Sequence, residues 1–357
     1  MKTKLETLAA MLPDKISAAL VAAPHNLCYL TGFPSGDSWL FITRENAYFL
    51  TDFRYIEVAK ATITGAECVM ITRLSQALTE LCQKQGITRI YLEAGETSLA
   101  QGALLRQAVS NVEFECGDEL DSWLSGMRAV KDEREVALIE QAQRITEAGF
   151  EHILPYIREG ATEREVALEL EFFMRREGAQ RVAFDFIVVS GANTSLPHGI
   201  PCHKPIAKGD FITMDFGAVV DGYHSDMTRT VALGYVSDEQ KHVYDTVLKA
   251  QQAALSTLKA GVSCVKGDAA ARDIIAAAGY GNCFGHGTGH GVGVQVHEGP
   301  NLSPRAGERL LTPGNVVTVE PGIYLEGRFG VRIEDMVLIT KDGCRNLTRS
   351  PKELLIL

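Results

Sequence analysis

The chain has 357 residues, of which 46% are hydrophobic and 22% charged, a composition typical of a globular protein with room for two domains. Its 45 acidic residues outnumber its 35 Lys and Arg residues, and the resulting net charge of −10 argues against a nucleic-acid partner. No run of about 18 apolar residues occurs, which excludes a transmembrane helix, and we expect no membrane partner.

The eight cysteines are scattered and form no CxxC pair. Their spacing favours neither a disulfide scaffold nor a zinc ribbon. Because the first residues also lack the apolar core of a signal peptide, we expect a cytoplasmic protein.

The first 125 residues alternate between short strands and helices. Aromatic and β-branched runs predict strands at 38–43, 47–51, 67–72 and 88–93, with a hairpin around residues 44–46. Helical patterns occur around 75–85 and 98–109. This alternation indicates an α/β layer domain, which we place at residues 1–126.

A second domain, predicted at residues 127–357, begins with a long helical pattern that opens at 131–135. Thr162–Glu165 and Ser237–Gln240 have the sequence of capping boxes, so each should start a helix. The second of these helices should end near Gly261, since glycine commonly follows the last helical turn.

The second domain contains an internal repeat. Residues 208–217 and 313–322 share glycine, threonine, an acid and a second glycine at equal spacing. Each copy continues to an acid–glycine pair and then to a further acid, Asp226 in the first copy and Glu334 in the second. Two similar halves, each with helices followed by a β-hairpin, explain this pattern.

The first hairpin can be placed in register. Asp221-Gly222 is a favoured two-residue turn, and in the register that it sets Asp215 opposes Thr228. Asp226 is then the diagonal neighbour of Asp215 on the same face, within about 7–8 Å. Because Arg229 falls on the opposite face, a bound cation is the better partner for the two carboxylates.

In the second hairpin, Glu320 and Glu334 share a face only if the loop has an odd number of residues or a strand is bulged. We expect a five-residue loop at 326–330, which would reproduce the diagonal arrangement of the first half, or an equivalent bulge.

A glycine-rich segment, 284–293, contains two histidines. Glycine at alternate positions excludes a stable helix, so His286 and His290 are not the helical pair of an HExxH zinc site. If the segment is extended, His286, Thr288 and His290 share one face.

Five of these residues resemble the ligands of the pita-bread metallopeptidases, the family of methionine aminopeptidase, aminopeptidase P and prolidase. They match in order, residue type and context: Asp215, Asp226, His290, Glu320 and Glu334. Residues 26–33 and 52–55 resemble the N-terminal domain of creatinase, prolidase and aminopeptidase P, and 331–335 resembles the proline-specific branch. The resemblance implies an α+β protein, with a C-terminal pita-bread fold of pseudo-twofold halves and an α/β creatinase-type N-terminal domain.

The resemblance also implies two divalent metal ions that bridge a hydroxide. The oxygen-rich ligand set favours Mn²⁺, with Co²⁺, Fe²⁺ and Zn²⁺ as alternatives. Glu320 is similar to the proton shuttle of the family, and His297 to the residue that binds the tetrahedral intermediate. His198 is similar to the residue beside the scissile peptide.

For two further residues, His286 and Arg332, the sequence leaves two roles open. His286 resembles a pocket residue near the proline ring, but a purely structural role is as consistent with its context. Arg332 faces the metals beside Glu334, either as a catalytic or substrate-contacting residue or as a counter-ion only. For His224 we expect a structural role.

The implied activity is hydrolysis of the Xaa-Pro bond at the N-terminus of peptides or in dipeptides, by a metallopeptidase that forms a homodimer. Small peptides with proline in the second position would be the substrates. The sequence leaves open whether dipeptides or longer peptides are preferred. A methionine aminopeptidase and a non-catalytic peptide- or protein-binding module remain as alternatives.

Overall fold

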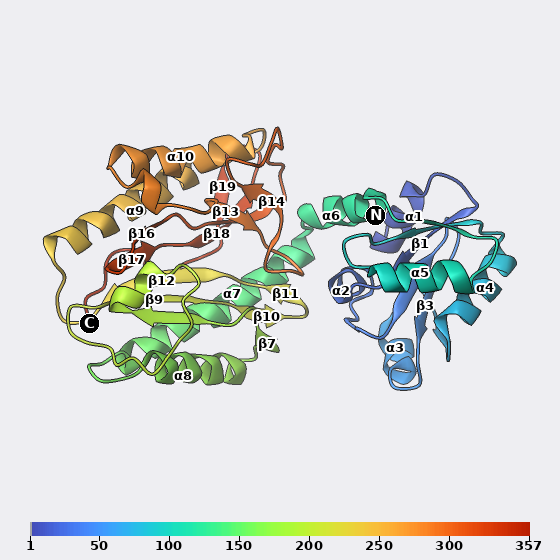
Figure 1. Cartoon of the computed structure of the whole chain (residues 1–357), viewed down its shortest axis with the longest axis horizontal. Coiled ribbons are helices and arrows are strands. Elements are labelled where there is room, and N and C mark those ends of the chain that lie inside the picture. The colour runs from blue at the N-terminus through green and yellow to red at the C-terminus, as the bar shows by residue number, and fades with distance from the viewer. Residues whose placement is uncertain (1) are drawn as a thin grey trace. The chain divides into compact units, whose positions relative to one another are not determined.

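The computed structural model describes residues 2–357. The chain divides into two compact units, one that ends at Arg128 and one that spans Ala129–Leu357. In Figure 1 the N-terminal unit runs from blue to green and the C-terminal unit from green to red. No helix among residues 2–357 is long and apolar enough to cross a membrane.

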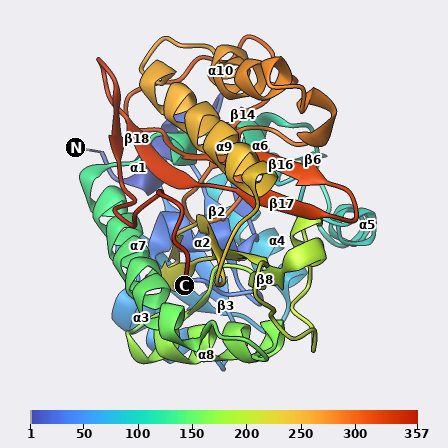
Figure 2. The same cartoon turned by 90° about the vertical axis from the view of Figure 1, so that its left-hand side faces the viewer.

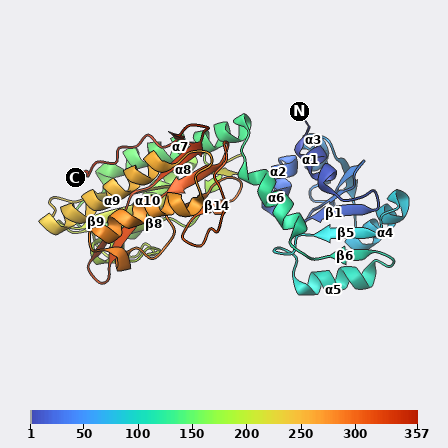
Figure 3. The same cartoon turned by 90° about the horizontal axis from the view of Figure 1, so that it is seen from above.

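The N-terminal unit is built on one mixed six-stranded sheet. In sheet order its strands are β4 (Glu67–Met70), β3 (Ala47–Thr51), β2 (Trp39–Ile42), β1 (Ser17–Val21), β5 (Arg89–Leu92) and β6 (Glu113–Glu115). Figure 3 shows β1, β5 and β6 side by side. The four predicted strands and the hairpin between β2 and β3 are confirmed. The buried strand β1 was not predicted, since its sequence, SAALV, has neither alternation nor β-branched enrichment.

Helices precede, connect and follow these strands, as expected for an α/β domain. They are α1 (Lys4–Met11), α2 (Pro24–Thr31), α3 (Ile56–Thr62), α4 (Leu74–Gln85), α5 (Leu99–Ala108) and α6 (Glu119–Ala129). α4 and α5 confirm the two predicted helices. Leu78 and Cys82 of α4 pack with Leu20 and Phe41 of the sheet in one hydrophobic core, so alternate strand residues are buried by the helical layer.

The C-terminal unit places two helix pairs around several small sheets. α7 (Glu133–Ile153) and α8 (Glu163–Arg176) lie on one side of the strands, and α9 (Asp238–Thr257) and α10 (Cys264–Ala277) on the other (Figures 1 and 2). Each pair covers its own hydrophobic core, the first with Phe150 and Leu170, the second with Val247 and Ile275.

Four sheets lie between the helix pairs. The first consists of β11 (Tyr223–His224), β10 (Ala218–Val220) and β7 (Arg181–Val182). The second consists of β12 (Met227–Ala232), β9 (Phe211–Phe216) and β8 (Ile187–Ser190). The third is β14 (Glu298–Leu302), β13 (Gly289–Gly291), β15 (Val316–Val319), β18 (Asp335–Ile339) and β19 (Cys344–Asn346). The fourth pairs β16 (Gly322–Leu325) with β17 (Phe329–Arg332).

Both predicted capping boxes are present. Thr162 accepts a hydrogen bond from the backbone of Glu165 at the start of α8, and Ser237 accepts one from Gln240 at the start of α9. These side chains satisfy helix N–H groups that have no partner within the helix. α9 ends at Thr257, a few residues before the predicted Gly261.

The predicted register of the first hairpin is confirmed. Val220 pairs with Tyr223 across the turn, and Asp215 pairs with Thr228. Asp221 and Gly222 both have positive φ, 46° and 82°, as a two-residue turn of this type requires. Asp215 and Asp226 therefore lie on one face, as diagonal neighbours.

The five-residue loop predicted for the second hairpin is wrong. Leu325 pairs with Phe329, so the loop has the three residues 326–328, an odd number but a shorter one. Gly327 closes it with a φ of 69°, and Phe329, which is buried, joins the strand and the core. The pairs on either side place Glu320 directly opposite Glu334 rather than diagonal to it.

Candidate active site

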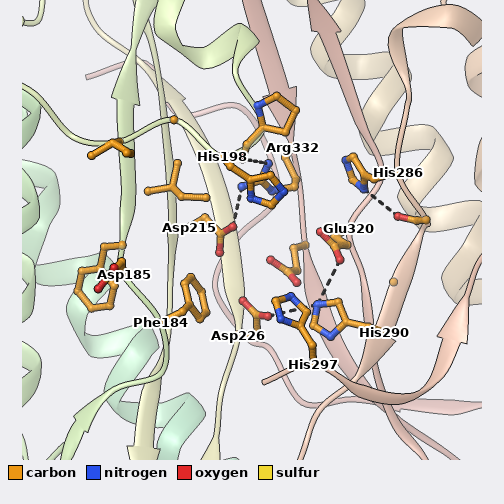
Figure 4. A pocket seen from close by; sticks show the side chains of 18 of the residues that line it. Phe184, Asp185, His198, Asp215, Asp226, His286, His290, His297, Glu320 and Arg332 are labelled. Carbon is orange, nitrogen blue, oxygen red and sulfur yellow. Dashed lines mark hydrogen bonds and ion pairs between the residues drawn. The ribbon is translucent and has the colours of Figure 1, made fainter. Parts of the chain in front are cut away.

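One cavity of the C-terminal unit, with a volume of about 740 Å³, collects the residues singled out in the sequence. Its lining includes all nine of them: His198, Asp215, Asp226, His286, His290, His297, Glu320, Arg332 and Glu334. Figure 4 shows their side chains converging from strands and loops that are far apart in the sequence.

Three of the four acidic side chains, Asp226, Glu320 and Glu334, lie close to His290 in this cavity. His290 Nε2 lies 3.3 Å from Glu320 Oε1 and 3.6 Å from Asp226 Oδ2 (Figure 4). Asp226, His290 and Glu334 each offer one ligand atom, and these atoms lie within 4.8 Å of one another. Each hairpin thus contributes two acids, and β13 contributes the imidazole.

Burial has a large effect on these groups. Together with the charges of Glu334 and Asp215, it raises the pKa of Asp226, and burial raises the pKa of Glu320 to about 8. Burial and the charge of Glu320 raise the pKa of Glu334 in the same way. Burial lowers the pKa of His290 to about 3, so its ring is neutral, as a metal ligand must be. The protein therefore compensates only part of the negative charge of the cluster, through the ion pair between Arg332 and Asp215.

Two buried carboxylate oxygens in the cluster have no hydrogen-bond partner, Asp215 Oδ1 and Glu334 Oε1. A buried oxygen of this kind is costly unless a donor or a cation satisfies it. Carboxylate oxygens and a neutral imidazole are ligands for hard and borderline divalent cations. The cluster therefore fits divalent metal ions.

Arg332 occupies the edge of the acidic cluster. Its guanidinium donates to Asp215 Oδ2 at 2.6 Å, to Thr228 Oγ1 at 3.0 Å and to the Tyr324 hydroxyl at 2.9 Å. Thr228 in turn donates to Glu334 Oε2 at 2.7 Å. Arg332 thus holds one acid of the first hairpin and leaves the second oxygen of that acid available.

The histidines occupy different parts of the wall. The rings of His290 and His297 lie 4.3 Å apart between centroids, and His286 Nε2 lies 2.9 Å from the Tyr324 hydroxyl. Burial lowers the pKa of His286 to about 4 and that of His297 below its ordinary value. His198 lies across the cavity, near Arg332 (Figure 4).

The shared face expected for His286, Thr288 and His290 is not formed. The segment is a strand only over Gly289–Gly291, and it bends at both His286 and Thr288. Thr288 is buried, and its backbone N–H and hydroxyl both donate to Asp268 Oδ1 at 2.9 Å. The two histidines line the cavity, whereas Thr288 anchors the segment to α10.

Arg229 and His224 lie outside the cavity, as the sequence indicated. Arg229 is buried and pairs with Asp335 at 2.8 Å, on the face opposite to the acidic cluster. His224 is buried, its Nδ1 lies 3.1 Å from the Gly293 carbonyl, and burial lowers its pKa to about 4.

Models of two known domain families match the chain. The model described as the creatinase/prolidase N-terminal domain matches residues 5–130. The model of metallopeptidase family M24 matches residues 137–341, more than half of the chain and the whole of the cavity.

The chain belongs to metallopeptidase family M24. Among its M24 relatives, the Xaa-Pro dipeptidase of Pyrococcus horikoshii is 37% identical over 96% of this chain and 95% of that protein. The solved structure of the Xaa-Pro dipeptidase from Bacillus anthracis has a TM-score of 0.95 and 40% identity, covering 99% of both chains. That of the X-Pro aminopeptidase from Thermotoga maritima has a TM-score of 0.90 and 40% identity, covering 96% of this chain and 98% of that chain. The resemblance and the fold class expected from the sequence are confirmed.

Some residues of this M24 site were missed in the sequence. Alternation along the strands could have found two of them, since Thr228 opposes Asp215 and Tyr324 lies four positions after Glu320 on the same face. Other residues come from irregular segments, where no periodicity indicates the direction of a side chain; they include Phe184, Asp185 and Ile200.

Proposed function

We propose that this protein hydrolyses the bond between an N-terminal residue and a following proline, in dipeptides or at the start of longer peptides. The observation that carries the proposal is the convergence of two acids from each hairpin around His290 in one cavity. Relatives that match nearly the whole chain are named Xaa-Pro dipeptidase and X-Pro aminopeptidase, which supports the choice of substrate.

Two divalent ions would be held by the five residues of the cluster: Asp215, Asp226, His290, Glu320 and Glu334. When bound, such ions polarise the scissile carbonyl and lower the pKa of the attacking water. Four carboxylates and one imidazole favour Mn²⁺ over a thiolate-preferring ion, and the partnerless oxygens of Asp215 and Glu334 support this ligand set.

The remaining chemistry is assigned to side chains of the cavity wall. The Glu320 carboxylate would take a proton from the attacking water and pass it to the proline nitrogen as that nitrogen leaves. His297 would donate a hydrogen bond to the oxygen that becomes negative in the tetrahedral intermediate. His198 would contact the peptide next to the scissile bond, and Arg332 would keep Asp215 in place and contact the substrate.

Proline substrates require a site of this kind because the Xaa-Pro bond is a tertiary amide with no N–H. A peptidase that needs that N–H as a donor cannot bind the bond productively. We place the proline ring near His286, whose ring is neutral and hydrogen-bonded to Tyr324.

The state of the protein in the cell is also part of the proposal. We propose a homodimer, on the resemblance to the family alone. The eight scattered cysteines support a reducing compartment, the cytoplasm.

One assay series tests the activity. The Mn²⁺-loaded protein is given Xaa-Pro dipeptides, Xaa-Pro-Xaa tripeptides and Met-Ala-type peptides. We expect kcat/KM for the dipeptides or the tripeptides with proline to be at least ~100-fold higher than for the Met-Ala-type peptides. This ratio corresponds to a difference of about 2.7 kcal/mol in transition-state binding. A preference for Met-Ala-type peptides would contradict the proposal, as would the absence of any hydrolysis by metal-loaded protein.

A further inference from the structure

The loop that carries His198 has two ends that lie close together in the fold. We call residues 191–201 the histidine loop. It begins after β8, whose last residue is Ser190, and its far part lines the cavity with Pro197, His198 and Ile200. Residues Gly191–Ser195 form a 3-10 helix and the rest of the loop has no regular structure, so its position depends on its contacts with neighbouring segments, including those at its two ends.

Both ends of the histidine loop are joined by one carboxylate. Glu163, the first residue of α8, is fully buried. Its Oε1 accepts hydrogen bonds from the backbone N–H of Ser190 at 2.7 Å and from Asn193 Nδ2 at 3.0 Å. Its Oε2 accepts from the backbone N–H of Cys202 at 3.2 Å. A single side chain therefore closes the neck of the loop.

The main chain of α8 provides a second attachment that does not use the carboxylate. The N–H groups of Glu163 and Arg164 donate to the carbonyls of Lys204 and Cys202, at 3.2 and 3.0 Å. N–H groups in the first turn of a helix have no partner within the helix, so these bonds belong to the fold of the backbone. Replacing the side chain of Glu163 therefore leaves the helix start attached.

The opposite side of the histidine loop contacts the strand that carries Arg332. The N–H of Gly330 donates to Thr194 Oγ1 at 2.8 Å, and Arg332 Nη1 donates to the Pro197 carbonyl at 3.2 Å. Because Arg332 also binds Asp215, a shift of the loop would reach both His198 and the acidic cluster.

We propose that Glu163 is a positioning residue, which holds the histidine loop so that His198 and Arg332 keep their places in the cavity. The inference rests on the proposed function for the role of His198. A glutamine at position 163 keeps the size of the side chain but turns an N–H donor toward one of the N–H groups at the neck. One end of the loop then loses its partner, while no charge is left unpaired.

Glu93 is a matched control for this substitution. It is also fully buried, and it accepts hydrogen bonds from the backbone N–H groups of Ala22 and Ala23 and from the Asn26 side chain. It does not line the cavity. Glu93→Gln therefore damages the same kind of donor set without touching the histidine loop.

The experiment compares the wild type, Glu163→Gln, Glu93→Gln, His198→Ala and the double variant Glu163→Gln/His198→Ala, all loaded with Mn²⁺. Steady-state kinetics with an Xaa-Pro substrate are combined with hydrogen exchange of residues 190–202. We expect Glu163→Gln to lower kcat/KM by about 10–100-fold at unchanged metal content, because small displacements of substrate-positioning groups cost this much. In the His198→Ala background the same change should cost less than about 3-fold, since the two residues act together.

Exchange over residues 190–202 should be faster in Glu163→Gln and unchanged in Glu93→Gln. Equal activity losses in Glu163→Gln and Glu93→Gln would overturn the proposal, as would full additivity with His198→Ala or unchanged exchange in the loop. If the wild type hydrolyses no Xaa-Pro substrate, the proposed function fails, and the exchange comparison still decides whether Glu163 holds the loop.

Discussion

Each half of the C-terminal unit holds a segment of the cavity wall with a buried acid, but the two acids have different partners. In both, the second helix supplies a buried acid that holds a cavity segment with a histidine, Glu163 on α8 and Asp268 on α10. Glu163 accepts from neutral donors, whereas Asp268 is paired with Arg272 at 2.7 Å. The repeated scaffold therefore fixes where an anchoring acid is needed but not how its charge is balanced.

The hairpins of the two halves differ as well. A two-residue turn sets Asp215 and Asp226 on a diagonal, and a three-residue loop sets Glu320 directly opposite Glu334. The imidazole of the cluster, His290, comes from the second half. One scaffold used twice thus produces an asymmetric ligand set, in which two metal ions would have different surroundings.

Removing one acid from either half tests whether both hairpins are needed. We expect Asp226→Asn and Glu334→Gln each to lower kcat/KM by about 1,000-fold or more, since each removes one carboxylate of the proposed ligand set and its charge. Metal content, measured by mass spectrometry of the reconstituted protein, should fall in parallel. Wild-type activity in either variant would show that one half alone forms the site.

Asp335 has no counterpart in the first half, and it joins the halves through Arg229 of β12. It is fully buried and accepts hydrogen bonds from Arg229 at 2.8 Å and Lys352 at 2.6 Å. Asp335→Asn should lower the free energy of unfolding by about 3–5 kcal/mol, because it leaves buried cations without their partner. Urea denaturation measures this, with Asp245→Asn, in an exposed pair with Lys241, as a control that should cost under about 1 kcal/mol.

The contribution of Asp335 to the free energy of unfolding should also depend on pH. Burial alone would raise the pKa of Asp335, but the charges of Arg229 and Lys352 hold it below its ordinary value. A carboxylate with a lowered pKa stabilises the fold above its unfolded-state pKa, so its contribution should fade as the pH falls below about 4. A difference between wild type and variant that persists unchanged at pH 3 would contradict this.

Metal removal should expose the pH dependence that the acidic cluster imposes on the stability of the fold. The folded-state pKa values of Asp226, Glu320 and Glu334 lie above their ordinary values. Such groups stabilise the fold at low pH and lose that contribution as the pH rises, here toward about 8. Relative to the metal-loaded protein, chelated protein should therefore lose more melting temperature at pH 8 than at pH 5.

Adding Mn²⁺ at a hundred times its Kd should restore about 2.7 kcal/mol. At one fixed Mn²⁺ concentration the gain should be larger at pH 8, because the carboxyl ligands bind fewer protons there and the Kd is lower. Thermal melts over a titration of Mn²⁺ at both pH values measure this gain. Glu334→Gln serves as the control, because its melting temperature should respond much less to the metal.

Substitution of the two anchoring acids, Glu163 and Asp268, compares the halves most directly and has the smallest expected effects on stability. Asp268→Asn should cost about 2 kcal/mol, since it leaves Arg272 without its carboxylate partner although that side chain remains 25% exposed. Glu163→Gln should cost about 1 kcal/mol, because its partners are neutral donors and no charged group is left without its partner. Urea denaturation of both variants decides the order, and the reverse order would show that the charge pair of the second half is not the stronger anchor.

Much of the site could be predicted because short-range rules determined it. Asp221-Gly222 specifies a two-residue turn, and that turn alone sets the register of the first hairpin. The alternation of side chains then places Asp215 and Asp226 on one face. The second loop could not be predicted in the same way, since its length depends on Phe329 entering a core built from distant segments.

Other features depended on contacts that sequence spacing does not contain. Thr288 turns away from the histidines because Asp268, twenty positions earlier in the chain, accepts its hydrogen bonds. The histidine loop and the segment with Phe184 have no periodicity, so their places in the cavity follow from anchors such as Glu163.

The central claim is that two hairpins and one imidazole hold a pair of divalent ions in an Xaa-Pro peptidase. Anomalous diffraction from crystals grown with Mn²⁺ tests it most directly. The account predicts two anomalous peaks among the side chains of Asp215, Asp226, His290, Glu320 and Glu334. No peak within this cluster, or Mn²⁺ bound only elsewhere, would contradict it.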